Sequence, residues 1–248
     1  LFFNISPTEA ESMDPQQRLF LQSSWHAIEH SGYNAEDLSG TRCGVFVGCT
    51  TSDYHALSQE QQHSARSFTG GATSILGARI SYFLNLQGPC WSVDTACSSS
   101  LVAIANACDS LNAGSSDLAL AGGVYVMSGP GMHIKTSQSG MLSPTGRCYS
   151  FDARANGFVP GEGVGVVVLK RLKEAQSDQD QIHGVIRGWG VNQDGKSNGI
   201  TAPNAQSQTR LEREVYDRYD IDPSQIQLIE THGTGTPLGD PKIGRAHV

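Results

Sequence analysis

Helical patterns alternate with short apolar runs along most of the 248-residue chain, and this order constrains the fold more than any other feature. Asp14 and Pro15 are typical of a helix start, and Leu21, Trp25 and Ile28 then repeat at helical spacing. A second apolar helical face covers residues 101–111, and further helices are expected at about 72–84 and 205–219.

Between these helices lie short runs of apolar and β-branched residues, which predict buried strands. They cover residues 43–49, 90–93, 118–126, 164–169, 182–189 and 227–231. Strands that alternate with helices are typical of an α/β fold in which helices cover both faces of a sheet.

Composition excludes several classes of protein. With 38% hydrophobic and 17% charged residues, the chain is neither disordered nor fibrous, and its apolar runs are too short to cross a membrane. Residues 1–124 contain 4 Arg, no Lys and 11 acidic residues, whereas residues 125–248 contain 13 basic and 13 acidic residues and carry no net charge. This acidic balance argues against nucleic-acid binding, but it leaves room for an acidic carrier protein that docks on a local basic patch.

The six cysteines include no CxxC pair, and no charged-then-apolar leader opens the sequence. We therefore expect a reducing, cytoplasmic location.

Residues 190–197 (GVNQDGKS) match the G-x-x-x-x-G-K-[ST] phosphate loop letter for letter. That motif requires a helix that begins at the lysine, because the helix N-terminus holds the phosphates. Here Gly199 and Pro203 fall where the first helical turns should be. We therefore favour a turn between two elements over a nucleotide site at Lys196.

His26, Glu29 and His30 fit the H-x-x-E-H zinc pattern on a predicted helix. However, no third ligand can be picked out, and such residues are ordinary on the polar side of an amphipathic helix. We therefore predict that the chain binds no metal.

Cys97 lies at a strand-to-helix turn, because it follows the predicted strand at 90–93 and precedes a predicted helix. This is the geometry of a nucleophile elbow, and the positive end of the helix favours the thiolate. The alternative is a small buried apolar residue, the usual role of a cysteine outside disulfides. We favour that alternative for Cys43, Cys49 and Cys108, whereas both interpretations stay open for Cys97.

His232 lies where the predicted strand at 227–231 gives way to a loop of small, hydroxyl-bearing residues. Loops at strand ends line clefts, so this is a common place for a catalytic imidazole. A cysteine and a histidine far apart in sequence can be neighbours in the fold, as thiolate catalysis requires. Each of the two residues alone is a weak indication of function.

Together, residues 94–100 (DTACSSS) and 231–236 (THGTGT) resemble the two signature motifs of β-ketoacyl synthase domains from modular polyketide synthases. The sequence also resembles the family at residues 13–18, 121–124, 151–153, 161–163 and 191–195. The resemblance extends from about residue 2 to Pro241. It accounts for the apparent phosphate loop, because the family has the same Asn-Gln-Asp-Gly turn.

The resemblance implies a thiolase-type α/β fold, in which two similar halves form a five-layer αβαβα sandwich, usually in a homodimer. The chain opens at Leu1 rather than Met and stops soon after a glycine-rich loop. We therefore expect a fragment that is truncated at both ends. Residues 1–242 would be a partial synthase domain, the first half plus the start of the second half.

The resemblance also implies a ping-pong reaction. Cys97 would accept an acyl chain from the phosphopantetheine thioester of an acyl carrier protein, with its own N–H in the oxyanion hole. His232 would help to decarboxylate a malonyl-type thioester, and the carbanion would attack the acyl-Cys97 thioester to give a β-ketoacyl product. Thr234 and Thr236 match threonines that contact the phosphopantetheine arm, which the carrier supplies, so no cofactor bound to this chain is expected.

The family has a second catalytic histidine, in an Asn-x-Gly-His segment with a nearby lysine, and the sequence ends before that segment. The alternative function is therefore a non-elongating synthase that binds acyl chains and passes them on without condensation. Residues 156–162 resemble synthases served by free-standing acyltransferases more than those with a built-in one.

The last six residues, 243–248 (IGRAHV), differ from the acidic helix start with which the family continues. The string matches the translation of a common sequencing adapter. We therefore predict that it is a non-native tail, and we give His247 no catalytic role.

Overall fold

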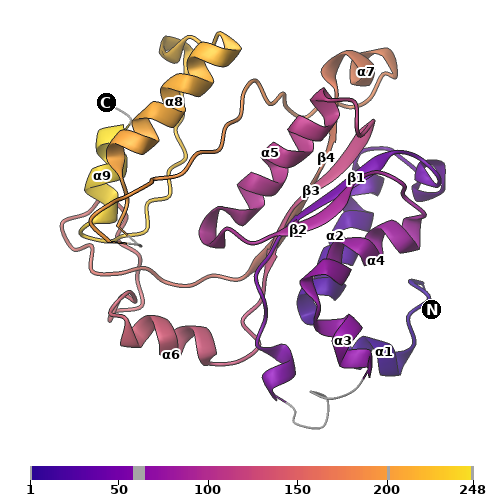
Figure 1. The fold of residues 1–248 in the computed structure, drawn as a ribbon, viewed down its shortest axis with the longest axis horizontal. Coiled ribbons are helices and arrows are strands. Elements are labelled where there is room, and N and C mark those ends of the chain that lie inside the picture. Colours follow the sequence, from indigo (N-terminus) through magenta and orange to yellow (C-terminus); the bar gives the residue numbers. More distant parts are fainter. Residues whose placement is uncertain (1, 58–64, 200–201, 247–248) are drawn as a thin grey trace. The chain divides into compact units, whose positions relative to one another are not determined.

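The computed structural model describes residues 2–57, 65–199 and 202–246, and the chain divides into two compact units. Unit 1 comprises Leu1–Gly129 and Glu162–Val185, and unit 2 comprises Pro130–Gly161 and Ile186–Val248. The colours of Figure 1 follow the chain through both units.

Unit 1 contains the four strands and most of the helices of the described residues (Figure 1). Its elements are α1 (Pro7–Ser12), α2 (Pro15–His30), η1 (Ala35–Leu38), β1 (Cys43–Gly48), η2 (Tyr54–Leu57), α3 (Ala65–Gly71), α4 (Thr73–Leu84), β2 (Cys90–Val93), η3 (Ala96–Ser98), α5 (Ser99–Asn112), β3 (Leu118–Tyr125), β4 (Gly163–Lys170) and α7 (Leu172–Ser177). Unit 2 contains α6 (Gly131–Gln138), α8 (Ala205–Tyr219), η4 (Pro223–Gln225) and α9 (Gly239–Ala246). The four predicted helices correspond to α2, α4, α5 and α8.

The sheet of unit 1 has the strand order β2-β1-β3-β4. β1 pairs in parallel with β2 and β3, whereas β4 runs antiparallel to β3. Because Gly48 is paired with both Val93 and Gly123, the carboxyl ends of the three parallel strands meet at one edge of the sheet. β2 and β4 are the two edge strands and are only partly buried, with Trp91 of β2 and Val167 of β4 exposed. The prediction of buried strands at these two positions is therefore wrong.

Helices cover both faces of this sheet, as predicted (Figure 1). Alternate residues of β1 point to opposite faces. Val45 and Val47 pack in a core with apolar residues of α2 and α4, whereas Phe46 packs against Ala103 and Ala107 of α5. Burying a side chain of this size contributes about 1.5–3 kcal/mol, so these two layers supply much of the stability of unit 1.

Two residues start α2, as predicted. Asp14 Oδ1 accepts the N–H of Gln16 at 2.8 Å, and Pro15 occupies the first helical position, where no N–H is needed. The helix ends at His30, and Gly32 then takes a φ of 85°, which suits glycine in the turn that follows.

Two of the predicted strands are wrong. The structure assigns residues 182–189 and 227–231 to neither a strand nor a helix. A strand requires a ladder of hydrogen bonds to a neighbouring strand, and apolar, β-branched composition alone does not supply one. In keeping with this, Val185 is 48% exposed and Leu228 is 82% exposed.

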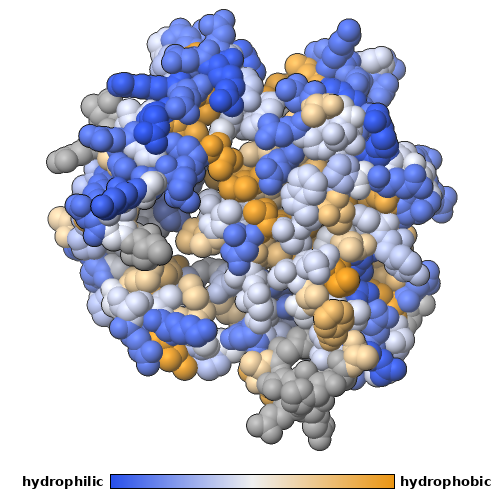
Figure 2. Space-filling view, viewed as in Figure 1, coloured by the Kyte–Doolittle hydropathy of each residue, from blue (hydrophilic) through white to orange (hydrophobic). Residues whose placement is uncertain are grey.

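Hydrophilic residues cover most of the face shown in Figure 2, and apolar residues form separate patches among them. No helix in the described part of the chain is both long enough and apolar enough to span a membrane.

Candidate active site

Cys97 lies in η3, directly between the end of β2 and the start of α5, as the sequence predicts. The turn is strained, because Ala96 has a φ of 56°, a left-handed conformation that is uncommon outside glycine. Side chains hold it in place. Asp94 Oδ1 accepts the N–H of Ala96 at 3.0 Å, and Ser99 Oγ accepts the N–H of Thr95 at 2.8 Å. Cys97 is thus presented on a fixed turn at the N-terminus of a 14-residue helix.

Two glycines bring this helix directly against the carboxyl edge of the sheet. A Cβ atom on Gly48 would lie 2.4 Å from the backbone N of Ser100, and one on Gly123 would lie 2.7 Å from Cβ of Ser100. Larger residues would push the N-terminus of α5 away, so both glycines determine where Cys97 lies in unit 1.

The six cysteines occupy different environments. Cys43, Cys49 and Cys108 are buried, as predicted, and burial raises the pKa of Cys43 to about 12 and that of Cys49 to about 11. Cys97 and Cys148 are exposed. Exposure favours the nucleophile interpretation of Cys97 over that of a buried apolar residue.

Tyr125 lies at the same carboxyl edge of the sheet as the Cys97 turn, although sequence reasoning did not select it. It ends β3 on the same sheet face as Gly123, because residues two apart in a strand share a face. Its pKa is raised by burial and then by the charges of Asp53, Glu162 and Cys97. The place of Tyr125 at the end of a predicted strand was the only signal in the sequence.

His232 lies in unit 2, in a segment between η4 and α9 that is neither helix nor strand, and its side chain is exposed. Gly233 and Gly235 both have a positive φ, which lets the loop turn sharply. The hydroxyls of Thr234 and Thr236 lie 3.2 Å apart, within hydrogen-bonding distance. The structure therefore brings the two predicted threonines together, two and four residues after His232.

The predicted site residues are divided between the two units. Cys97 belongs to unit 1, whereas His232, Thr234 and Thr236 belong to unit 2. Each group is positioned within its own unit.

The phosphate-loop motif forms a loop, as predicted. The described residues that follow Lys196 include no helix before α8, which begins at Ala205 and is capped by the Asn204 side chain. Asn192 Nδ2 donates to the carbonyl of Ser207 at 2.9 Å, so the loop packs against the first turn of α8. Among the described residues, no helix begins at Lys196 to hold a phosphate, and a nucleotide site is not supported there.

His26 and His30 lie on α2, as predicted. The ring of His30 stacks on His183 with 4.8 Å between the ring centroids. Within residues 2–57, 65–199 and 202–246, no group of three or more His, Cys, Asp or Glu residues is arranged to hold a metal ion.

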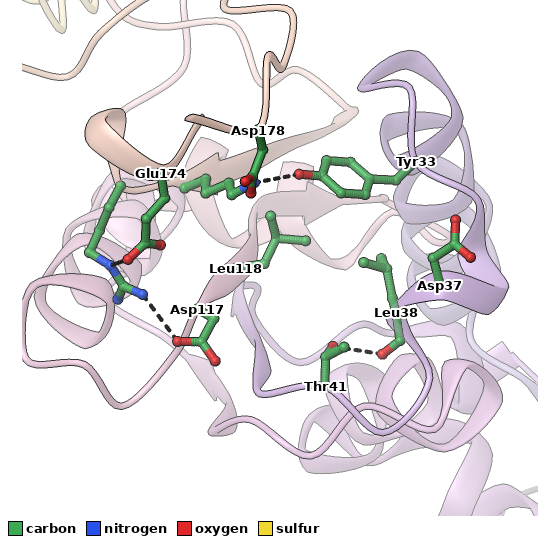
Figure 3. A pocket seen from close by; sticks show the side chains of 10 residues that line it. Tyr33, Asp37, Leu38, Thr41, Asp117, Leu118, Glu174 and Asp178 are labelled. Atoms are coloured by element: carbon green, nitrogen blue, oxygen red, sulfur yellow. Dashed lines mark hydrogen bonds and ion pairs between the residues drawn. The ribbon is translucent and has the colours of Figure 1, made fainter. Parts of the chain in front are cut away.

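A pocket of about 430 Å³ lies at the opposite edge of the sheet from Cys97, beside the start of β3 (Figure 3). Lys170 Nζ donates to Tyr33 Oη at 2.7 Å and to Asp180 Oδ2 at 2.8 Å, and Arg171 Nε donates to Glu174 Oε1 at 2.7 Å. These charged groups pair with one another, so the pocket is lined by structural ion pairs, and we place no site there.

Two sequence models of one protein family match this chain. "Beta-ketoacyl synthase, N-terminal domain" matches residues 1–175, and "Beta-ketoacyl synthase, C-terminal domain" matches residues 183–246. The chain therefore belongs to the beta-ketoacyl synthase family, and the predicted resemblance is confirmed.

Within that family, the chain is similar to polyketide synthases. The chain is 52% identical over 241 residues to polyketide synthase PksL of Bacillus subtilis, a match that covers 97% of this chain and 5% of that protein. It is 51% identical over 242 residues to one component of the phenolphthiocerol/phthiocerol polyketide synthase of Mycobacterium tuberculosis, a match that covers 97% of this chain and 16% of that protein.

Solved structures confirm the predicted thiolase-type α/β fold. A mutant of the ketosynthase from module 6 of the bacillaene synthase of Bacillus subtilis 168 matches with a TM-score of 0.93 at 50% identity, over 99% of this chain and 41% of that one. An oxazolomycin ketosynthase domain from Streptomyces albus matches with a TM-score of 0.94 at 39% identity, over 99% of this chain and 42% of that one. The chain thus spans less than half the length of these solved ketosynthases.

Proposed function

We propose that this chain carries out acyl transfer and condensation in a polyketide-type β-ketoacyl synthase. The observation that carries the proposal is the Cys97 turn, in which a strained backbone presents an exposed thiol at the N-terminus of α5. Membership of the family makes carrier-bound acyl thioesters the expected substrates.

In the first half-reaction, the Cys97 thiolate attacks the carbonyl carbon of an acyl-phosphopantetheine thioester. The N–H of Cys97 stabilises the oxyanion of the tetrahedral intermediate. The bond to the pantetheine sulfur then breaks, and that thiolate takes up the proton that Cys97 lost. The product is an acyl-Cys97 thioester, and the carrier leaves with its thiol restored.

In the second half-reaction, a malonyl-type thioester loses CO₂, and its electron pair becomes an enolate. We propose that His232 hydrogen-bonds to the developing enolate oxygen, which lowers the barrier to decarboxylation. The enolate carbon attacks the acyl-Cys97 carbonyl and expels the Cys97 thiolate. The β-ketoacyl product is two carbons longer and stays on the carrier.

The phosphopantetheine arm comes from the carrier protein, and we propose that Thr234 and Thr236 contact it. Their hydroxyls lie side by side at the end of the His232 loop, which supports a shared role in binding the polar arm. We further propose that the domain acts as a homodimer in the cytoplasm, where the reducing conditions suit its six cysteine thiols.

The test uses a completed domain, in which this chain is joined to the regions of the module 6 bacillaene ketosynthase that it does not span. After incubation with an acyl-pantetheine thioester, peptide mass spectrometry should place one acyl group on Cys97. Cys97→Ala should abolish the adduct, whereas Cys148→Ala, which removes the other exposed thiol, should keep it. Acylation that persists in Cys97→Ala would show that the proposed nucleophile is wrong.

A further inference from the structure

Tyr125, the last residue of β3, points to the face of the sheet that α5 covers. On this face Ala119 and Ala121 pack against α5, and a Cβ atom on Gly123 would lie 2.7 Å from Cβ of Ser100. Residues two apart in a strand share a face, so Tyr125 is the next residue on the α5 side. It lies about 6.6 Å beyond Gly123, toward the carboxyl edge of the sheet.

The Cys97 turn projects past Gly123 on the same face. The start of α5 contacts the position of Gly123, whereas the carbonyl of Leu111, near the other end of the helix, accepts a hydrogen bond from Arg171 at 2.7 Å. Arg171 directly follows β4 and lies at the opposite edge of the sheet. The helix therefore runs from the carboxyl edge to the amino edge, and the turn before it extends toward Tyr125.

Two carboxylates hold the backbone that follows Tyr125. Glu162 Oε1 accepts the N–H of Met127 at 2.6 Å, and Asp53 Oδ1 accepts the N–H of Gly129 at 3.1 Å. The three segments involved all belong to unit 1. The strand end that carries Tyr125 is therefore fixed relative to the Cys97 turn.

The phenol of Tyr125 is available as a hydrogen-bond donor. Burial, and then the negative charges of Asp53, Glu162 and Cys97, raise its pKa, so the hydroxyl stays protonated at neutral pH. Within the part of the chain that the structure describes, no other group forms a hydrogen bond with this hydroxyl. A half-buried donor at the edge that carries the nucleophile can therefore serve a bound molecule.

The acyl chain on Cys97 would bring an acceptor to this edge. Each condensation of the proposed reaction leaves a keto group on the β-carbon. A chain made by an earlier reaction of this class therefore carries an oxygen on that carbon, whether as the keto group or reduced to a hydroxyl. The chain begins at the thiol, so this oxygen lies at the end of the chain that is closest to the Cys97 turn.

We infer that Tyr125 is a specificity-determining residue whose hydroxyl donates a hydrogen bond to the β-oxygen of the acyl chain on Cys97. This inference rests on the proposed function, in which Cys97 is acylated. A keto or hydroxyl oxygen accepts such a bond, whereas a saturated chain has no acceptor on that carbon. One hydrogen bond of this kind favours the oxygenated chain by about 3- to 10-fold.

The test uses the completed domain and two thioesters that differ only in the β-hydroxyl, 3-hydroxybutyryl-pantetheine and butyryl-pantetheine. The two thioesters compete for Cys97, and intact mass gives both initial rates of acylation, with the faster-reacting enantiomer of the hydroxylated chain. Tyr125→Phe removes only the hydroxyl. It should lower the ratio of hydroxybutyryl to butyryl acylation by about 3- to 10-fold, through the hydroxybutyryl rate alone.

Tyr82→Phe is the matched control, because it removes the hydroxyl of a tyrosine that is 89% exposed on α4 of the same unit. Its ratio should equal that of the unsubstituted domain. An unchanged ratio in Tyr125→Phe would overturn the inference. An equal fall in both rates would also overturn it, since the hydroxyl would then act on the Cys97 turn or on folding and not on the acyl chain.

Failure of the proposed function gives a different result. If neither thioester acylates Cys97 in the unsubstituted domain, the proposed nucleophile is wrong, and the inference is overturned with it. If both thioesters acylate Cys97 at a ratio that Tyr125→Phe leaves unchanged, the proposed function stands and the inference alone is wrong.

Discussion

Gly48, the last residue of β1, allows the N-terminus of α5 to approach the sheet closely. An alanine Cβ at this position would lie 2.4 Å from backbone atoms of Ser99 and Ser100, and backbone cannot move aside as a flexible side chain can. We therefore predict that Gly48→Ala lowers the free energy of unfolding by about 1–3 kcal/mol, the usual effect of overpacking. Urea denaturation of the full chain measures this difference.

Gly184→Ala is the control for that prediction. Gly184 also lies in unit 1, and a Cβ there would meet no atom within 4 Å. The control should stay within about 0.5 kcal/mol of the unsubstituted chain. Equal stability of the two alanine variants would mean that the contact between Gly48 and α5 is looser than the structure indicates.

Among single residues, the sequence alone could identify those whose roles depend on the predicted elements directly before and after them in the chain. Cys97 could be selected because a predicted strand and a predicted helix flank it, and His232 because it follows an apolar run. The hydrogen bond from the N–H of Phe151 to the Asp240 side chain could not be predicted, since the two residues are 89 positions apart. Contacts of that separation leave no periodic signal in a single sequence.

Three elements of unit 1 meet at Lys170, the last residue of β4. Its Nζ donates to Tyr33, which follows α2, and to Asp180, which follows α7. Burial alone would lower the pKa of Lys170, but its hydrogen bonds to Asp178, Asp180 and Tyr33 raise the pKa above the usual lysine value. Burial alone would raise the pKa of Asp180, but the hydrogen bond from Lys170 makes it lower than usual.

These two shifts predict how the stability depends on pH. The contribution of Asp180 is present above the unfolded-state pKa of about 3.9 and is lost as the pH falls through the lower folded-state value. The contribution of Lys170 is present below about pH 10.4 and is lost as the pH rises through its higher folded-state value. The network therefore stabilises unit 1 across the whole range between these limits.

We predict that Lys170→Met lowers the free energy of unfolding at pH 7 by about 1–3 kcal/mol, because it leaves a half-buried carboxylate without its cation. The difference in free energy of unfolding between this variant and the unsubstituted chain should become smaller below about pH 4, where Asp180 becomes protonated. Lys173→Met, at an exposed position on α7, is the control and should change little at either pH. If the loss in free energy of unfolding caused by Lys170→Met stays constant between about pH 3 and pH 7, this explanation of the pH dependence is wrong.

The elements themselves were predictable to different degrees. The apolar runs of β1, β2, β3 and β4 predicted strands correctly, because each of these strands has a neighbour in the sheet. The runs at 182–189 and 227–231 have the same composition but no such pairing in the described chain. The short helices α6 and α7 were missed, because helices of eight and six residues depend on tertiary contacts more than on their own pattern.

At the scale of the whole molecule, the residues proposed for catalysis are divided between two units. The chain leaves unit 1 after Gly129, returns at Glu162 and enters unit 2 again at Ile186, and no low-complexity linker in the sequence marks these crossings. The prediction of a single partial domain at residues 1–242 therefore stays a prediction. The family could nevertheless be identified, because its two signature motifs are each local and do not depend on how the units are divided.

Because Cys97 belongs to unit 1 and His232 to unit 2, one substitution should separate the two half-reactions. In the completed domain, His232→Ala should leave the acylation of Cys97 largely unchanged, since that step depends on the thiolate. Decarboxylation should fall by about 10²- to 10⁴-fold, the usual contribution of a positioned acid, base or hydrogen-bond donor. Acyl transfer is followed by intact mass, and decarboxylation by the release of labelled CO₂ from a malonyl thioester.

His133→Ala is the control, because His133 is an exposed histidine on α6 of the same unit, and both rates should be retained. Equal loss of both half-reactions in His232→Ala would contradict the proposed role of this histidine. If the unsubstituted domain, in which the joined regions supply the second histidine, acylates Cys97 but releases no CO₂, the residues of this chain do not support elongation, and the non-elongating function is favoured. In that case the Cys97 turn would serve to hold and pass on acyl chains, because acyl transfer needs only the nucleophile and its oxyanion hole.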